Sequence, residues 1–128
     1  MSTPLEQRAE VNDLEALQER RKDILVEFAP LKAMHGPFGL FDHKRKAMVS
    51  GMKIKARLKL IASGGKVTDD IVDAEAHVDP QYLSWLDEQM ADKVRFVHLE
   101  AELDSLHELI RDRELGLQIH NSEIKLAR

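Results

Sequence analysis

Eight Lys or Arg residues lie between His43 and Thr68, a stretch of 26 residues that contains neither Asp nor Glu. The other 11 basic residues and all 23 acidic residues lie elsewhere, so a segment of charge +8 stands beside a remainder of charge −12. Clustered cations bind the phosphates of a polyanion, and an acidic surface repels polyanions from the rest of a chain. The alternative is a solvated helical face that balances acidic neighbours, although a helix stabilised by its own i,i+4 pairs would contain some Glu. We therefore expect this stretch, the basic segment, to bind a polyanion.

Residue types that catalyse reactions or bind metals are present but poorly arranged. None of the six His residues belongs to a His-Glu-x-x-His motif, and the chain has no Cys for a disulfide, a thiol nucleophile or a zinc site. His98 and Glu102 stand one helical turn apart, a spacing that fits an ordinary surface pair as well as two metal ligands. The loop Gly64–Thr68 differs from a phosphate-binding loop, because Leu60 and Val67 stand where that motif needs Gly and Ser or Thr. The sequence predicts no enzyme, no metal site and no cofactor.

No segment alternates apolar and polar residues as a half-buried strand does, so the fold is expected to be all-α. Capping residues, Gly and Pro divide the chain, taken as a single helical domain over residues 1–128, into four expected helices: 4–31, 43–62, 69–77 and 80–125. Pro30 should kink or end the first helix near Ala29, because proline lacks the backbone N–H and its ring opposes the preceding turn. Asp42 and Thr68 should cap the second and third helices through their side-chain oxygens.

The second expected helix contains most of the basic segment, and its apolar residues fall on one narrow stripe. On a helical wheel this stripe consists of Ala47, Gly51, Ile54, Leu58 and Ile61. Two rows of cations flank the stripe, with Lys44, Lys55 and Lys59 on one side and Lys46, Lys53 and Arg57 on the other. We expect the stripe to pack inward and both rows to stay within reach of solvent or phosphate.

Two offset apolar stripes run along the last and longest helix. The stripe of its first half consists of Leu83, Leu86, Met90 and Val97. Because one small subunit cannot bury both stripes, we predict a helical hairpin or coiled-coil subunit that assembles into a homo-oligomer. The predicted oligomerisation contacts lie on the second stripe, at Phe96, Leu99, Leu103, Leu106, Ile110 and Leu117. The alternative is a monomeric hairpin in which the first helix covers this surface.

A short motif in the basic segment resembles a known family. The stretch Met52–Gly64 resembles the L-K-A-R-L segment, followed closely by Ser-Gly, of UvsY, the recombination mediator of T-even-type phages. The pair Gln81-Tyr82 and the stretch Ile110–Arg113 continue the resemblance more loosely. In that family the Lys and Arg of the motif are implicated in binding single-stranded DNA. The resemblance implies the same role for Lys55 and Arg57.

The resemblance also implies an assembly and a function. It implies a ring-shaped homo-oligomer that binds single-stranded DNA and helps a RecA-like recombinase to displace single-strand-binding protein. Combined with the charge pattern of the basic segment, it predicts DNA contacts at Lys46, Lys53, Lys55, Arg57 and Lys59.

Two other classes of protein fit the same features. One is a coiled-coil structural or assembly protein of a phage, whose basic helix docks onto an acidic partner. The other is an inhibitor or adaptor of a nucleic-acid-handling enzyme that uses its acidic surface as a DNA mimic. No apolar run approaches the roughly 20 residues that cross a bilayer, so we expect no membrane partner. The expected location is cytoplasmic, in the host cell if the chain is phage-encoded.

Overall fold

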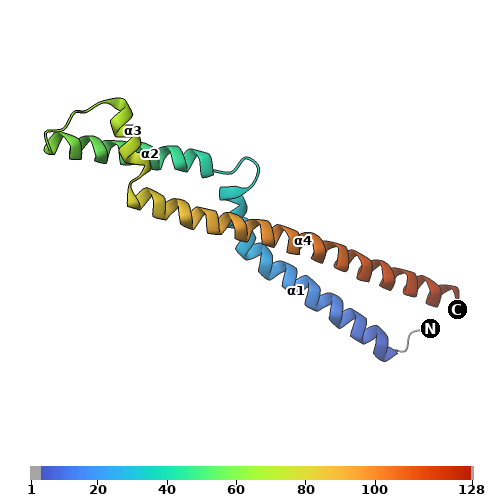
Figure 1. Ribbon diagram of the computed structural model, residues 1–128. Helices are drawn as coiled ribbons and strands as arrows, with labels where there is room; N and C mark the ends of the chain where they lie inside the picture. Colours follow the sequence, from blue (N-terminus) through green and yellow to red (C-terminus); the bar gives the residue numbers. More distant parts are fainter. Residues whose placement is uncertain (1–3, 128) are drawn as a thin grey trace. The chain divides into compact units, whose positions relative to one another are not determined.

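The computed structural model describes residues 4–127, with side chains from Asn12 onward. These residues form helices and no strand: α1 (Pro4–His35), α2 (Phe41–Ala62), α3 (Asp69–His77) and α4 (Pro80–Leu126) (Figure 1). The all-α fold and the long C-terminal helix are confirmed. Within the described residues, no helix combines the length and the apolar character needed to span a membrane.

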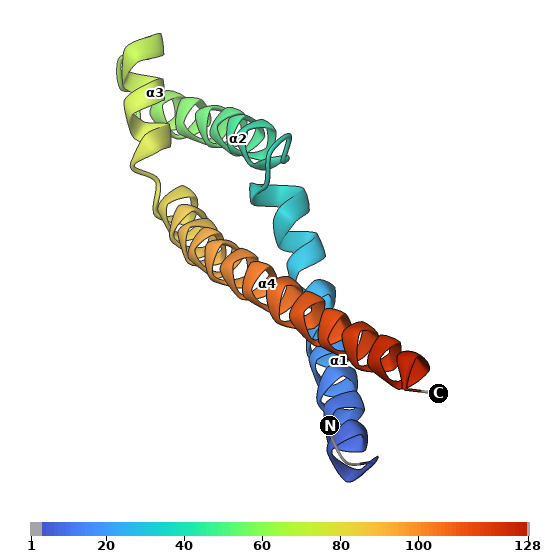
Figure 2. The same ribbon diagram turned by 90° about the vertical axis from the view of Figure 1, so that its right-hand side faces the viewer.

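Two compact units divide these helices between them. The hairpin unit combines the chain up to Pro30 with the chain from Val97 onward, and the basic unit is the continuous stretch Leu31–Phe96. In chain order, the basic unit is therefore an insertion between the two halves of the hairpin unit. It contains α2, α3 and the beginning of α4 (Figure 2).

In the hairpin unit, the segments of α1 and α4 run antiparallel. Asp13 pairs with Arg113 at 3.1 Å and Arg20 pairs with Glu102 at 2.6 Å, so the residue number in α4 falls as that in α1 rises. The facing apolar stripes of the two helices form the core of this unit: Ile24, Phe28, Leu99, Leu103, Leu106 and Ile110. Burial of these side chains is the main stabilising contribution in this unit.

This core includes most of the residues predicted to contact another subunit. Four of the six are at most 6% exposed in the hairpin unit: Leu99, Leu103, Leu106 and Ile110. Leu117 is half-buried, and Phe96, which belongs to the basic unit, is buried as well. Because α1 covers the stripe within one chain, the reason for assigning it to a second copy no longer holds. The stripe that stays largely uncovered is the first one, where Leu83 is 44% exposed and Met90 is 67% exposed.

The first helix continues beyond Pro30. Of the predicted kink or end near Ala29, the end is wrong, because α1 runs on to His35. Pro30 and Val26 both lie at exposed positions, so water can reach the Val26 carbonyl that loses its helical partner. The helix ends where Gly36 N–H donates to the Lys32 carbonyl at 2.8 Å.

The second helix begins two residues earlier than its predicted start. Its N-cap is Leu40, which makes no side-chain capping bond, so the predicted cap at Asp42 is wrong. Asp42 instead lies in the first turn, where it accepts hydrogen bonds from Arg45 and Lys46 and its negative charge suits the helix dipole. The backbone of the preceding connector sets the start, since Leu40 N–H is already bonded to the Ala33 carbonyl at 3.0 Å.

Glycine ends α2 and threonine starts α3. Gly64 has a φ of +72°, and Gly65 N–H donates to the Leu60 carbonyl at 3.1 Å, which is the Schellman pattern. Thr68 Oγ1 then accepts a hydrogen bond from Ile71 N–H at 3.3 Å, so the predicted cap at Thr68 is confirmed. These signals are local in the sequence, and they position α3 to turn back onto α2.

The basic unit buries the face of α2 opposite to the predicted one. Its core combines residues of α2, α3 and the first turn of α4: Val49, Met52, Ala56, Val72, Ala76 and Tyr82. The stripe predicted to pack inward is instead exposed, with Ile54, Leu58 and Ile61 between 61% and 64% exposed. Val49, Met52 and Ala56 also repeat at spacings of three and four, so the periodicity of α2 fits either face, and contact with α3 selects between them.

Candidate nucleic-acid interface

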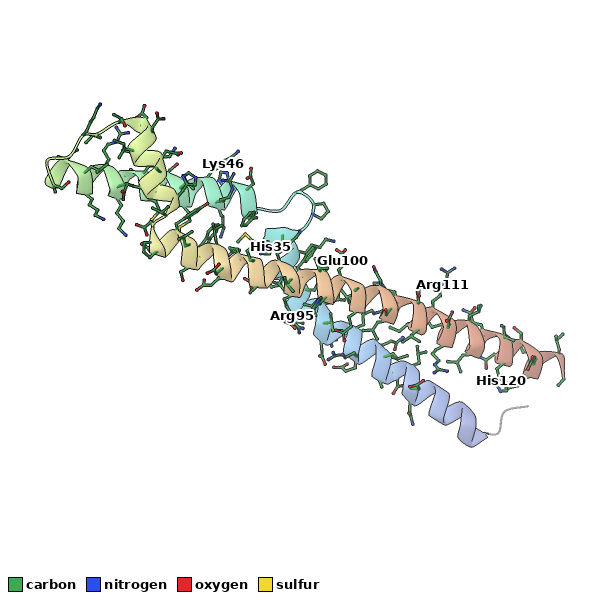
Figure 3. The ribbon with its side chains drawn as sticks, viewed as in Figure 1. His35, Lys46, Arg95, Glu100, Arg111 and His120 are labelled. Carbon is green, nitrogen blue, oxygen red and sulfur yellow. The ribbon has the colours of Figure 1, made fainter. Side chains whose placement is uncertain are left out.

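Helical spacing places the predicted DNA contacts in two rows on α2. Lys55 and Lys59 lie on one side of the exposed apolar stripe, and Lys46, Lys53 and Arg57 lie on the other. Four of these side chains are between 45% and 70% exposed, and Lys59 is exposed too. Lys46 can be seen near the beginning of α2 (Figure 3). The structure therefore brings the five predicted residues onto one helix, within reach of an external polyanion.

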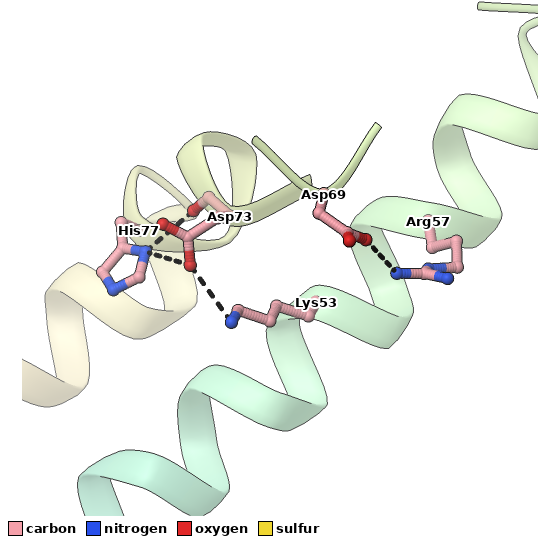
Figure 4. Close-up of polar contacts among 5 residues, drawn as sticks. All are labelled: Lys53, Arg57, Asp69, Asp73 and His77. Atoms are coloured by element: carbon pink, nitrogen blue, oxygen red, sulfur yellow. Dashed lines mark hydrogen bonds and ion pairs between the residues drawn. The ribbon is translucent and has the colours of Figure 1, made fainter. Parts of the chain in front are cut away.

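Four of the five predicted cations are paired with carboxylates of the same unit. The pairs are Lys46–Asp42 at 3.3 Å, Lys53–Asp73 at 3.1 Å, Lys55–Asp79 at 2.9 Å and Arg57–Asp69 at 3.3 Å. Figure 4 shows the two pairs that α2 forms with α3. Lys59 makes no ion pair with any described residue. The counter-charges of these four cations thus come from carboxylates that lie outside the acid-free stretch.

Two of these carboxyl groups are held in the ionised form by their partners. Hydrogen bonds from Arg45 and then Lys46 lower the pKa of Asp42 below its usual range. Lys55 lowers the pKa of Asp79, and the Gln81 N–H, which donates to Asp79 Oδ1 at 2.8 Å, acts in the same direction. Asp79 therefore caps the start of α4 and compensates the charge of Lys55 at once.

Three of the four pairs are well exposed and occupy their cations only weakly, whereas Lys55 pairs with Asp79, whose side chain is only 15% exposed. The pair between Arg57 and Asp69 has side chains that are 54% and 98% exposed, so water screens the attraction. Exposed pairs of this kind contribute roughly 0–1 kcal/mol each. A phosphate that approaches α2 can replace a carboxylate at small cost, and Lys44, Lys59 and Lys66 have no carboxylate to displace among the described residues.

The described residues contain no group of three or more His, Asp or Glu side chains arranged to hold a metal ion. In the pair His98 and Glu102, which stands one helical turn apart, Glu102 instead accepts a hydrogen bond from Arg20 at 2.6 Å.

A second feature, which no sequence pattern indicates, is a hollow beside the connector between α1 and α2. Its volume is about 380 Å³, and it is lined by Met34, His35, Phe38, Phe41, Gln89, Met90 and Lys93, among others. Phe38 lies at its edge and is fully exposed. In the sequence, Phe38 stands between Gly36-Pro37 and Gly39, a pattern that predicts a turn. The pattern does not predict which residues of α4 lie beside that turn.

No family model, curated protein or solved structure matches this chain. What the chain does must therefore be inferred from the geometry of α2 and its surroundings.

Proposed function

We propose that this chain binds single-stranded DNA along α2 and acts as a recombination mediator. In this role it helps to load a RecA-like recombinase onto DNA covered by single-strand-binding protein. The observation that carries the proposal is the pair of cation rows on the solvent side of α2, on a helix whose only acidic residue is Asp42. The resemblance of the motif around Lys55 and Arg57 to UvsY supports the mediator role.

The expected mode of binding is contact with phosphates rather than with base sequence. Each Lys or Arg that neutralises a phosphate releases condensed counterions, so affinity should fall steeply as salt rises. The carboxylates that now pair with α2 act as competitors of the phosphates, and their exposure keeps the exchange inexpensive. Binding should therefore be tolerant of sequence and sensitive to salt.

Assembly into a homo-oligomer, as in the proposed ring, would multiply these weak contacts. Several subunits that hold one strand together raise the overall affinity by orders of magnitude without any new kind of contact. The exposed apolar residues Leu83 and Val94 of α4 offer a surface for such an assembly, with exposures of 44% and 54%. We assign subunit contacts to these residues, because α1 already covers the second stripe.

Oligonucleotide binding measured by fluorescence anisotropy at several salt concentrations tests the proposal. A Lys55→Ala, Arg57→Ala variant should bind more weakly, with a salt slope shallower by about one to two units. The matched control is Lys22→Ala, Arg111→Ala, which removes the same charges from exposed positions of the hairpin unit. Arg111 points away from α1 (Figure 3). Equal losses in both variants, or none in either, would refute the assignment to α2.

A second function has one observation in its favour, the exposed stripe itself. Ile54, Leu58 and Ile61 stand at heptad spacing on the solvent side, between rows of cations. This surface is complementary to a partner helix that has an apolar stripe between acidic residues. Such a contact is expected if the chain is an assembly protein that docks onto an acidic partner. An Ile54→Ser, Leu58→Ser variant separates the two functions, since it should keep DNA binding and lose the docking of such a helix.

A further inference from the structure

The connector between α1 and α2 is a tightly bonded turn. Gly39 N–H donates to the Gly36 carbonyl at 2.9 Å, and Leu40 N–H donates to the Ala33 carbonyl at 3.0 Å. A Cβ on Gly39 would lie 2.5 Å from the Met34 carbonyl oxygen, so only glycine fits there. The chain path through this turn is therefore fixed by backbone contacts.

Phe38 is an unusual residue for the place it occupies in this turn. Its φ of +62° lies in the left-handed region, which Gly and Asn adopt more readily than an aromatic residue does. Its side chain is also fully exposed, so the ring gains nothing from packing within the chain. Neither the backbone nor the core explains a phenyl ring here, whereas an external flat partner does.

The hollow beside Phe38 has apolar walls and two polar atoms without partners. Met34, Phe41 and Met90 contribute the apolar lining. His35 is only 8% exposed, and the Gln89 side chain lies close enough to it to act on its pKa as a hydrogen-bonding neighbour. Neither His35 Nε2 nor Gln89 Oε1 has any other hydrogen-bond partner in the part of the chain that the structure describes. Buried polar atoms without partners are rare and call for an explanation, such as a bound molecule.

Neighbouring contacts hold the lining in place. Lys93 Nζ donates to the His35 carbonyl at 3.0 Å and so fixes the end of α1 against α4. The Phe41 ring stacks on the Trp85 ring at a centroid distance of 5.8 Å and an angle of 4°. The hollow is thus formed before any ligand arrives.

The chemistry of the lining selects a neutral, flat molecule with a hydrogen-bonding edge. Burial lowers the pKa of His35, with Lys93 acting in the same direction, so the imidazole is neutral at neutral pH and pairs poorly with an anion. A neutral His and the amide of Gln89 together offer donors and acceptors, which match the edge of a base, and Phe38 offers a face for stacking. The carboxylate of Asp42 at the rim is compensated by Arg45 and Lys46.

We propose that this hollow, with Phe38 at its edge, holds one base of the single strand whose phosphates lie along α2. The hollow adjoins the beginning of α2, where Lys44, Arg45 and Lys46 stand, so one strand can place a base in it and the next phosphates on these cations. This assignment rests on the proposed function of α2. It adds a base contact to a surface that otherwise reads only phosphates.

The test compares a short single-stranded oligonucleotide with an abasic oligonucleotide of the same length. The parent should bind the base-bearing strand more tightly, and only that strand should change the fluorescence of Trp85, the only Trp of the chain. A Phe38→Asn variant removes the ring and keeps a residue that tolerates positive φ. It should lose roughly five- to hundredfold affinity for the base-bearing strand and none for the abasic strand. Phe38→Tyr keeps an aromatic ring and should bind the base-bearing strand about as tightly as the parent does.

A second variant covers the case in which Phe38→Asn does not fold. Gln89→Leu removes the unpartnered acceptor and should likewise reduce the preference for the base-bearing strand, with an unchanged salt slope. If the parent binds both strands equally and the variants change neither affinity, the base site is wrong and the function of α2 stands. If the parent binds neither strand, the proposed function fails, and the base site fails with it.

Discussion

At the scale of single residues, the cations of α2 illustrate how a charge pattern can mislead. The acid-free stretch 43–68 ends next to Asp42 and Asp69, and these two residues pair with cations inside it. Counting charges within the stretch alone therefore gives only positive charge. In the folded unit, carboxylates next to the stretch neutralise part of that charge. The cations remain exposed, so a phosphate can reach them, but it has to displace the paired carboxylates in order to bind.

Removing the carboxylates that α3 offers to α2 should strengthen DNA binding. In an Asp69→Asn, Asp73→Asn variant, Arg57 and Lys53 no longer exchange a carboxylate for a phosphate. Since each exposed pair contributes roughly 0–1 kcal/mol, affinity for a single-stranded oligonucleotide should rise by about two- to tenfold at low salt. Anisotropy titrations measure this change.

The control is an Asp87→Asn, Asp104→Asn variant, which has the same change of charge at exposed positions without an ion pair among the described residues. Only the first variant should gain affinity by the full amount. An equal gain in the control would mean that overall charge, and not the release of α2, explains the effect.

Stability should fall as pH drops below about 6.5, because His35 is buried in its neutral form. Burial, aided by Lys93, lowers the pKa of His35 below its usual 6.5, while Asp92 and Gln89 oppose the shift. The unfolded chain then binds a proton that the folded chain rejects, so the contribution is full above 6.5 and lost as pH falls through the folded pKa. Urea unfolding of the parent and of His35→Leu measures this, and the variant should show a smaller loss. Identical pH profiles would contradict it.

At the scale of helices, the sequence predicted the elements well and their faces poorly. Helix ends marked by local signals, such as Gly64 and Thr68, could be foreseen because the chemistry of a cap is contained in a few consecutive residues. The buried face of α2 could not, since both faces carry apolar residues at helical spacing and only contact with α3 decides. The ion-pair partners and the hollow beside Phe38 depend on residues far apart in sequence, so no local pattern contains them.

Two glycines of the basic unit should respond to alanine in opposite directions. Gly64→Ala should destabilise the chain by about 1 kcal/mol, because Gly64 has a φ of +72° in the cap of α2. Gly51→Ala should stabilise it by roughly 0.5–1 kcal/mol, because Gly51 lies inside the helix and an added Cβ meets no atom within 4 Å. Thermal unfolding followed by circular dichroism measures both. A destabilising Gly51→Ala would indicate that this face is covered, as in an assembly.

At the scale of the whole molecule, the two units show which apolar stripe of α4 stabilises the fold of one chain and which is left for assembly. Most residues of the second stripe of α4 are buried in the core of the hairpin unit, whereas the first stripe keeps apolar surface exposed. A coiled-coil pattern alone does not reveal whether its partner helix belongs to the same chain or to another, so the sequence of the second stripe fits a subunit contact as well as a core within one chain.

Two aspartate variants should therefore have different effects. Leu106→Asp places a carboxylate in the hairpin core, where Leu106 is 6% exposed, and should cost about 3 kcal/mol or more of stability at every protein concentration. Val94→Asp changes a residue that is 54% exposed, so the chain should stay folded and its assemblies should become smaller. Thermal unfolding and light scattering distinguish the effects. A Leu106→Asp protein that was fully stable but dissociated would instead support a subunit contact on the second stripe.

The nesting of the basic unit within the hairpin unit has a consequence for the order of folding. Arg20 and Glu102 lie 82 positions apart, and an open loop of that length is entropically costly to close, with each doubling adding about 0.6 kcal/mol. When α2, α3 and the start of α4 form first through contacts close in sequence, the loop is already shortened before the hairpin closes. In this order of folding, the inserted unit lowers the entropic cost of pairing the two helical segments of the hairpin unit. A Val72→Ala change in its core should slow the closing of a hairpin to which Val72 does not belong, and stopped-flow refolding would detect the delay.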